Sequence, residues 1–261
     1  MIRASGVSRR FNDFLAVDQV SFEVPEGEIF AFLGPNGAGK TTTIRMLTTL
    51  LEPSEGQIAI DGLDVTRHRA EVRRRFGIVF QDPSLDVELT ALENLRIHGV
   101  LYGVSRRDCL ARGERLLRMF ELWERRNEPV KRYSGGMKRR LEIARSLLHT
   151  PRVIFLDEPT LGLDPQTRNQ LWNHVRALNE DEKVTVFLTT HYMDEAEKVA
   201  QRIAIIDHGR IVAQGSAAEL RTQTGTESLE EAFLALTGAQ IREEGAAGND
   251  FMRQMIRNSR R

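Results

Sequence analysis

The chain has 261 residues, of which 41% are hydrophobic, enough for one large core or a core with a smaller lobe. Basic and acidic residues both number 37, and this balance argues against general nucleic-acid binding, which usually needs a basic face. One cysteine excludes an internal disulfide, and no apolar run approaches the roughly 20 residues of a membrane span. We therefore expect a chain from a reducing compartment that is at most peripheral to a membrane.

The first part of the chain is predicted to be rich in short strands. Ser21–Val24 alternates polar and apolar residues, and a turn signal follows it. Ile29–Leu33 is a buried strand candidate that leads into a glycine-rich loop. A helix is predicted over Thr42–Leu51 and a further strand over Gln57–Ile60.

A helical region is predicted over about residues 87–150. Thr90 and Glu93 have the spacing of a capping box at a helix start, and so do Ser105 and Asp108. A later helix, which should end near residue 150, has one apolar face formed by Met137, Leu141, Ala144 and Leu148.

Strands and helices alternate after residue 150. Asp164 and Pro165 have the N-cap and first-turn identities of a helix, expected to run through Leu178. The other predicted elements are strands at Val153–Leu156 and Val184–Thr189, a helix at Met193–Ala200, and a hairpin of Ile203–Ile206 with Ile211–Ala213. This alternation predicts a parallel α/β core with helices on both faces.

The last part of the chain differs from the rest. Leu229, Phe233 and Leu236 predict one amphipathic helix. Residues 245–248 have the composition of a linker, and residues 252–261 carry four arginines. A solvated terminus is the favoured interpretation of those arginines, over a membrane-surface anchor.

A phosphate-binding loop is predicted between the Ile29–Leu33 strand and the helix that follows it. Glycines let the backbone wrap closely around a phosphate, and the helix N-terminus adds positive dipole. The lysine should reach the β- and γ-phosphates, and the threonine hydroxyl can bind Mg²⁺. The pattern G-x-x-x-x-G-K-(S/T) is met by Gly34, Pro35, Asn36, Gly37, Ala38, Gly39, Lys40 and Thr41.

Polar side chains follow two of the predicted strands and the apolar stretch Ile78–Phe80; in such sheets ligands bind at the carboxyl ends of strands. Asp157 and Glu158 end an apolar strand, so Asp157 can hold Mg²⁺ and Glu158 can polarise the attacking water. Gln81 could touch Mg²⁺ or water, and His191 could donate to the γ-phosphate. Each of these alone would more often be an ordinary surface residue; the upstream loop gives them their meaning.

These pieces, in this order, resemble the ATP-binding cassette family over roughly residues 2–220. The most specific addition is Tyr133–Arg140, just before the Asp157 strand, which resembles the signature sequence of that family. The resemblance implies an α/β fold: a P-loop NTPase core with a mainly parallel sheet flanked by helices, an N-terminal antiparallel β lobe and an inserted helical subdomain. It places the ATPase domain at residues 1–225, the subdomain at about 87–150, and a C-terminal helix with a basic tail at 226–261.

The resemblance also implies a role for each matched residue. Phe11 would stack on adenine, and the phosphate loop extends to Thr42. The matched signature core is Ser134, Gly135 and Gly136, which with Asp164 would contact ATP across a dimer.

The same resemblance assigns hydrolysis and metal binding. Glu158, His191 and Gln81 would be the catalytic residues, and Thr41, Gln81 and Asp157 would bind Mg²⁺. Tyr133 and Met137 depart from the usual Leu and Gln of the signature, so no role is carried over to position 137.

The implied partners are a membrane permease on another chain, contacted by residues of about 81–105, and a second copy of this chain, with ATP and Mg²⁺ bound and no nucleic acid. The protein would then lie on the cytoplasmic face of the cell membrane. The signature and the 227–238 segment are similar to drug-resistance and nodulation-type exporters. An importer subunit, a soluble ATPase without a transporter, and a cassette that binds ATP without hydrolysing it remain as alternatives.

Overall fold

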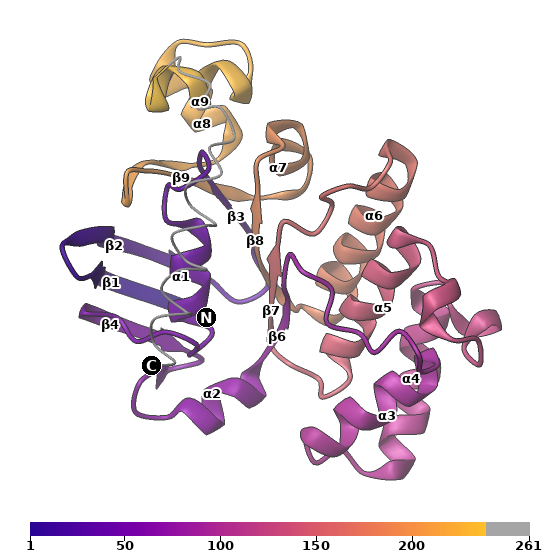
Figure 1. Ribbon diagram of the computed structural model, residues 1–261. Coiled ribbons are helices and arrows are strands. Elements are labelled where there is room, and N and C mark those ends of the chain that lie inside the picture. Colours follow the sequence, from indigo (N-terminus) through magenta and orange to yellow (C-terminus); the bar gives the residue numbers. More distant parts are fainter. Residues whose placement is uncertain (239–261) are drawn as a thin grey trace.

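Two sheets organise the computed structural model, which describes residues 1–238 (Figure 1). The core sheet has the strand order β10-β9-β3-β8-β7-β6, and all of its neighbours pair in parallel except β10 with β9. Its strands are β3 (Ile29–Leu33), β6 (Phe76–Val79), β7 (Val153–Asp157), β8 (Thr185–Thr190), β9 (Arg202–Asp207) and β10 (Arg210–Gly215). The predicted α/β class and the predicted hairpin are confirmed.

The second sheet is antiparallel and comes from the start of the chain. Its order is β2-β1-β4-β5, formed by β1 (Ile2–Phe11), β2 (Phe14–Val24), β4 (Glu55–Ile60) and β5 (Leu63–Asp64). Buried and exposed residues alternate along much of β2, as expected for a strand with one face on a core. Figure 1 shows α1 (Lys40–Leu47) between the two sheets.

Strand β3 contributes side chains to two hydrophobic cores, one on each face of the core sheet. Ile29, Ala31 and Leu33 face the core beneath the helices α5 (Gly135–Leu147) and α6 (Pro165–Glu182). Phe30 and Phe32 face the core shared with α1 and the antiparallel sheet. Successive side chains of a strand point to opposite faces, so a strand buried on both faces is apolar throughout. All five residues of β3 are buried, which is why the sequence shows an unbroken apolar run.

Helices cover the other face of the core sheet and extend past its β6 edge (Figure 1). The remaining helices are α2 (Arg69–Arg75), α3 (Ala91–Leu101), α4 (Arg106–Met119), α5 (Gly135–Leu147), α6 (Pro165–Glu182), α7 (Met193–Val199), α8 (Ala217–Thr224) and α9 (Leu229–Thr237), with 3₁₀ turns at Trp123–Arg125 and Val130–Arg132. The predicted basic tail at 252–261 lies outside the described residues. Within residues 1–238, none of the helices has the length and apolar character to cross a bilayer.

Helix boundaries test the local predictions. Thr90 and Glu93 form the predicted capping box, and Asp164 caps α6 with Pro165 in its first turn. Two predicted helix ends are wrong. Helix α6 continues past Leu178 to Glu182 and stops where Lys183 takes a left-handed φ of 54°. Helix α1 stops at Leu47 rather than residue 51, because Thr49 has a left-handed φ of 62°.

The strand register aligns the ends of the three central strands. Leu33 of β3 pairs with Thr190 of β8, and Thr189 of β8 pairs with Asp157 of β7. The loops that leave β3, β7 and β8 therefore start at the same edge of the sheet, next to one another. Side chains that directly follow these strands therefore lie close together and can form one site.

Candidate functional site

The predicted phosphate loop connects β3 to α1. Two of its glycines adopt backbone conformations that L-residues rarely take, with φ of 79° at Gly37 and 109° at Gly39. A Cβ atom at Gly39 would lie 2.8 Å from the carbonyl oxygen of Ala16, so this position also needs the absence of a side chain. The loop ends on Lys40, the first residue of α1, and thereby places a helix N-terminus beside the loop.

The side chain of Lys40 is buried and folds back against the start of the loop. Its ammonium donates to the carbonyl oxygen of Gly34 at 2.6 Å and to that of Pro35 at 3.3 Å. Burial lowers the pKa of Lys40 below its ordinary value, an effect that the nearby carboxylates of Glu158 and Asp157 oppose. The ammonium is therefore held by neutral carbonyl acceptors, and a charged phosphate oxygen would form a stronger hydrogen bond with it.

The end of β7 holds the two predicted carboxylates in a defined arrangement. Asp157 is buried and accepts a 2.6 Å hydrogen bond from the hydroxyl of Thr189 on β8. The backbone N–H of Glu158 donates to the Thr189 hydroxyl at 3.1 Å and to its carbonyl at 3.2 Å. Glu158 has a left-handed φ of 47°, a conformation that costs energy in a residue with a Cβ atom. Thr189 thus fixes both acids at the sheet edge.

His191 joins Glu158 from the neighbouring strand. Its Nδ1 atom lies 2.8 Å from Oε2 of Glu158, and Oε1 of the same carboxylate lies 3.9 Å from Nζ of Lys40. His191 directly follows β8, Glu158 directly follows β7, and Lys40 begins α1, so the aligned strand ends bring the three side chains together. Glu158 is buried, whereas the His191 side chain is partly open to solvent. A ligand entering here would meet a cation, a carboxylate and an imidazole at once.

The other residues predicted for the nucleotide lie around this centre. Gln81 is exposed on the loop after β6, and no hydrogen bond joins its side chain to the described part of the chain. Phe11 ends β1 with its ring half exposed, under the guanidinium of Arg9 at 4.7 Å. Thr41 is partly buried and Thr42 is buried in the first turn of α1.

The predicted signature begins helix α5, away from Lys40. The hydroxyl of Ser134 accepts from the backbone N–H of Met137 at 3.2 Å and so caps the helix. Ser134 and Gly135 are exposed, while a Cβ atom at Gly136 would lie 2.3 Å from Cγ2 of Thr167 on α6. Gly136 is therefore required for the close packing of α5 on α6.

Asp164 has a capping role within the chain itself. Its carboxylate accepts from the backbone N–H of Thr167 at 3.0 Å and from the Thr167 hydroxyl at 2.6 Å. The hydroxyl bond is the largest cause of the lowered pKa of Asp164. The exposed carboxylate lies beside the first turn of α6 and makes no contact with Lys40 or Glu158 in the described residues.

Two residues of the site were not predicted from the sequence. In the sequence, Thr189 is one of several β-branched residues of a buried strand and carries no distinguishing signal. Only the order of strands in the sheet places its hydroxyl against Asp157. Arg139 is buried behind Glu158 and donates to its carbonyl oxygen at 3.1 Å. The spacing of Arg139, Glu142 and Arg145 at every third residue is the signal that could have shown a polar face of α5 directed inward.

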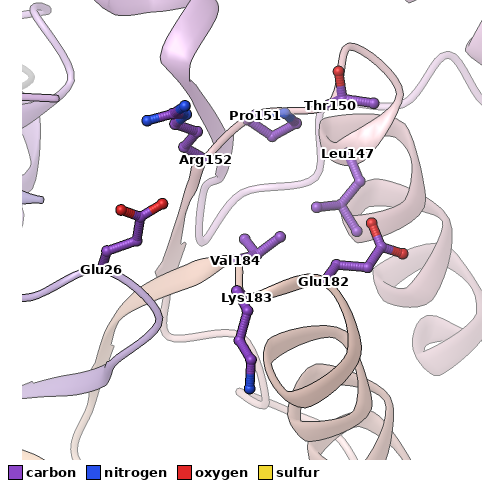
Figure 2. Close-up of a pocket in the computed structure, with 8 residues that line it drawn as sticks. All are labelled: Glu26, Leu147, Thr150, Pro151, Arg152, Glu182, Lys183 and Val184. Atoms are coloured by element: carbon purple, nitrogen blue, oxygen red, sulfur yellow. The ribbon is translucent and has the colours of Figure 1, made fainter.

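A separate cavity of 250 Å³ lies at the opposite edge of the core sheet, where β7 and β8 begin (Figure 2). Figure 2 shows the side chain of Glu26 on the other side of this opening from those of Leu147 and Glu182. Its walls are Glu26, Leu147, Thr150, Pro151, Arg152, Glu182, Lys183 and Val184. None of the predicted site residues lines it, because they all follow the carboxyl ends of the strands.

Known proteins are similar in sequence to this chain over most of its length. Residues 17–161 match the family described as ABC transporter. The chain is 48% identical to the daunorubicin/doxorubicin resistance ATP-binding protein DrrA of Streptomyces peucetius, over 93% of this chain and 72% of that protein. It is 42% identical to the Nod factor export ATP-binding protein I of Ralstonia nicotianae, over 85% of this chain and 69% of that protein.

Solved structures share the fold. The structure of an ATP-binding subunit of an ABC transporter matches with a TM-score of 0.82 and 32% identity, over 90% of this chain and 99% of that one. A dimeric ATP-binding cassette in a post-hydrolysis state, bound to ADP and Pi, matches with a TM-score of 0.74 and 29% identity, over 83% of this chain and 98% of that one. The fold is thus one in which nucleotide-bound dimers are known.

Proposed function

The chain belongs to the ABC transporter family, and from this membership we propose that it hydrolyses ATP to drive export through a membrane subunit on another chain. It is an ATP-binding protein of the export type, since the relatives described above are named for drug resistance and for Nod factor export. In this proposal, residues 1–225 form the ATPase domain and about 87–150 its helical subdomain. In this proposal, the transported compound is a drug, lipid or glycan-like molecule.

The observation that carries the hydrolysis proposal is the meeting of Lys40, Glu158 and His191 at one sheet edge. In our proposal, the loop amides and Lys40 bind the triphosphate, and Glu158 accepts a proton from the water that attacks the γ-phosphorus. His191 orients the Glu158 carboxylate and donates to the γ-phosphate. Phosphoryl transfer needs positioning and charge compensation more than covalent chemistry, and this arrangement supplies both.

Mg²⁺ fits the oxygen groups beside the loop. Magnesium prefers hard oxygen ligands and usually keeps several waters, so it needs few protein groups. The Thr41 hydroxyl, the buried Asp157 carboxylate and the Gln81 amide oxygen are the groups we assign to it. Bound there with the nucleotide, the ion would neutralise charge on the phosphate oxygens, while Thr189 keeps Asp157 oriented.

We assign the signature to the ATP of a second copy of the chain. Ser134 and Gly135 are exposed at the N-terminus of α5, a helix of 13 residues, where backbone N–H groups favour an anion. In a homodimer, these residues and Asp164 would contact the nucleotide held by the partner's loop. Phe11 would stack on the adenine of the ATP in the loop of its own chain. The dimeric cassette described above supports this arrangement.

Helix α3 carries the surface we assign to the membrane partner. Val100 and Leu101 are 78% and 76% exposed, and Ile97 on the same helix is 51% exposed. Val87, on the loop of residues 81–90, is a further exposed apolar side chain, at 40%. Water contact with so many large apolar side chains on one short helix is unfavourable, and an apolar helix of a permease would cover them. The chain would then lie at the cytoplasmic face of the membrane.

The substitution Glu158→Gln tests the proposal. It removes the proton acceptor but keeps the size of the side chain and one of its two acceptor oxygens. We expect ATP affinity within about threefold of wild type and phosphate release lower by about 100-fold or more, the typical contribution of a general base. The variant should also form an ATP-dependent dimer on size-exclusion chromatography. Unchanged phosphate release would remove Glu158 from this role.

A further inference from the structure

Arg139, buried behind Glu158, is the residue of the site to which the proposed function gives no role. It lies on α5 and is only 7% exposed. A guanidinium has five N–H groups in a rigid plane, and in Arg139 every nitrogen has an acceptor. Nε donates to the carbonyl of Pro159 at 2.8 Å, Nη1 to Phe80 and to Glu142, and Nη2 to Asp157 at 3.0 Å and Glu158 at 3.1 Å.

Four of these five acceptors are backbone carbonyls of two loops that are far apart in the sequence. Three are consecutive backbone carbonyls at the end of β7, and they include that of Glu158. Another is the carbonyl of Phe80, which comes directly before Gln81. Arg139 therefore joins the loop that carries the hydrolytic carboxylate to the loop that carries the assigned Mg²⁺ ligand, from behind both.

The contacts at Glu158 fall on a strained backbone. This residue has a left-handed φ of 47°, and such conformations persist only where the surroundings hold them. Thr189 holds the Glu158 N–H from one side, and Arg139 holds its carbonyl from the other. The direction of the Glu158 carboxylate therefore depends on Arg139.

The loop of residues 80–86 is tied to the same face of α5. Glu142 accepts from the backbone N–H of Ser84 at 2.7 Å, and Arg145 donates to the Ser84 carbonyl at 2.8 Å. Further along the loop, the backbone N–H of Asp86 donates to the side chain of Asn94 on α3 at 3.0 Å. A continuous set of hydrogen bonds thus runs from α3 through the 80–86 loop and α5 to Glu158.

We propose that Arg139 is a positioning residue that makes the 80–86 loop and the Glu158 turn move as one unit, so that a permease helix docked on α3 sets the orientation of the Glu158 carboxylate. This rests on the proposed function, because α3 is the assigned docking face. In this proposal Arg139 acts through the Glu158 turn and the 80–86 loop, and does not bind ATP itself. Its effect would appear in the rate of hydrolysis and in the response to the partner, and not in ATP affinity.

Three variants separate positioning from mere stability. Arg139→Lys keeps the charge but has three donors for five acceptors. Arg139→Met leaves Glu142 buried without its cation, so that variant is expected to be less stable. The double variant with Arg139→Met and Glu142→Met leaves no buried unpaired charge and is expected to be more stable than Arg139→Met, although the carbonyls that Arg139 holds lose their donor. Arg118→Met is the matched control, since that arginine pairs with Glu114 on the exposed surface of α4.

Each variant is measured for binding of a fluorescent ATP analogue, for steady-state kcat and KM, and for the stimulation of kcat by the permease in lipid vesicles. For Arg139→Lys and the double variant, we expect ATP affinity and KM within about threefold of wild type. We expect kcat lower by roughly 100-fold, the effect of a misplaced catalytic group, and no stimulation by the permease. Arg118→Met should match wild type in all three readouts.

Two outcomes overturn the proposal. One is a double variant that folds and keeps wild-type kcat and stimulation. The other is a loss of ATP affinity in parallel with kcat, which would make Arg139 a general support of the fold. If the wild-type chain hydrolyses ATP but the permease does not stimulate it, the docking face is wrong, and the basal kcat of Arg139→Lys still decides whether the arginine positions Glu158.

Discussion

Replacing Gly34 with alanine would put a methyl group where the phosphate loop has no room. The new Cβ would lie 2.3 Å from the carbonyl oxygen of Ile206 and 2.8 Å from its Cγ2 atom. Ordinary contact begins at 3.4 Å. The Ile206 carbonyl belongs to β9, which is paired on both sides in the core sheet, so the loop itself would have to move by about 1 Å. The Gly34 carbonyl, which accepts from Lys40, would move with it.

The strain should appear mainly when the loop closes on a nucleotide, because the free loop can relax outward. Overpacking of this kind costs about 1–3 kcal/mol. At tenfold per 1.4 kcal/mol, ATP affinity should fall by roughly 5- to 140-fold. The assay is a titration with a fluorescent ATP analogue, accompanied by thermal denaturation of the free protein.

Gly62→Ala is the matched control. Gly62 also needs a left-handed backbone, with φ of 76°, but a Cβ there would meet nothing within 4 Å, and the residue lies in the turn between β4 and β5. This variant should lose about 1 kcal/mol of stability and none of its ATP affinity. Wild-type ATP affinity in Gly34→Ala, at an unchanged melting temperature, would refute the assigned loop geometry.

Three further predictions concern other parts of the chain. His98 and His149 are buried, which is the largest cause of their lowered pKa values of about 3 and about 4. The unfolded chain therefore binds more protons below pH 6.5, and stability, complete above about pH 7, should fall by about 2 kcal/mol per imidazole at pH 5. His98→Phe should halve that loss in urea unfolding, and an unchanged loss would mean that His98 does not contribute. Leu101→Asp should abolish stimulation by the permease and keep basal hydrolysis, whereas Leu110→Asp, on α4, should keep both; equal stimulation in the two variants would contradict the docking face. Phe11→Ala should weaken binding of ATP by about tenfold, roughly the value of one lost stacking contact, and leave binding of inorganic triphosphate unchanged; an equal loss for both would contradict base stacking.

Local sequence signals predicted much of this fold because they have local causes. The capping box at Thr90 and the cap at Asp164 each satisfy backbone N–H groups within four residues, so their spacing alone is informative. The glycines of the phosphate loop are similar, because a left-handed φ is a property of one residue. The alternation of strands and helices was enough to predict a parallel core sheet.

Contacts between distant segments could not be predicted in this way. The bond between Thr189 and Asp157 requires β8 to lie beside β7, an order that depends on the whole sheet. The five acceptors of Arg139 come from three segments. The spacing of Arg139, Glu142 and Arg145 could indicate a polar face of α5, but not which loops that face contacts. Helix α2 was also missed, since only one of its residues, Val72, is buried, and so its apolar periodicity is weak.

The most direct test of the account is phosphate release by the purified wild-type chain, supplied with ATP, with and without Mg²⁺, and with its membrane partner in vesicles. The account predicts saturable, Mg²⁺-dependent release that disappears in Lys40→Met, because that variant loses the cation held between the phosphate loop and Glu158. Wild-type protein that neither binds ATP nor releases phosphate above background under these conditions would contradict it.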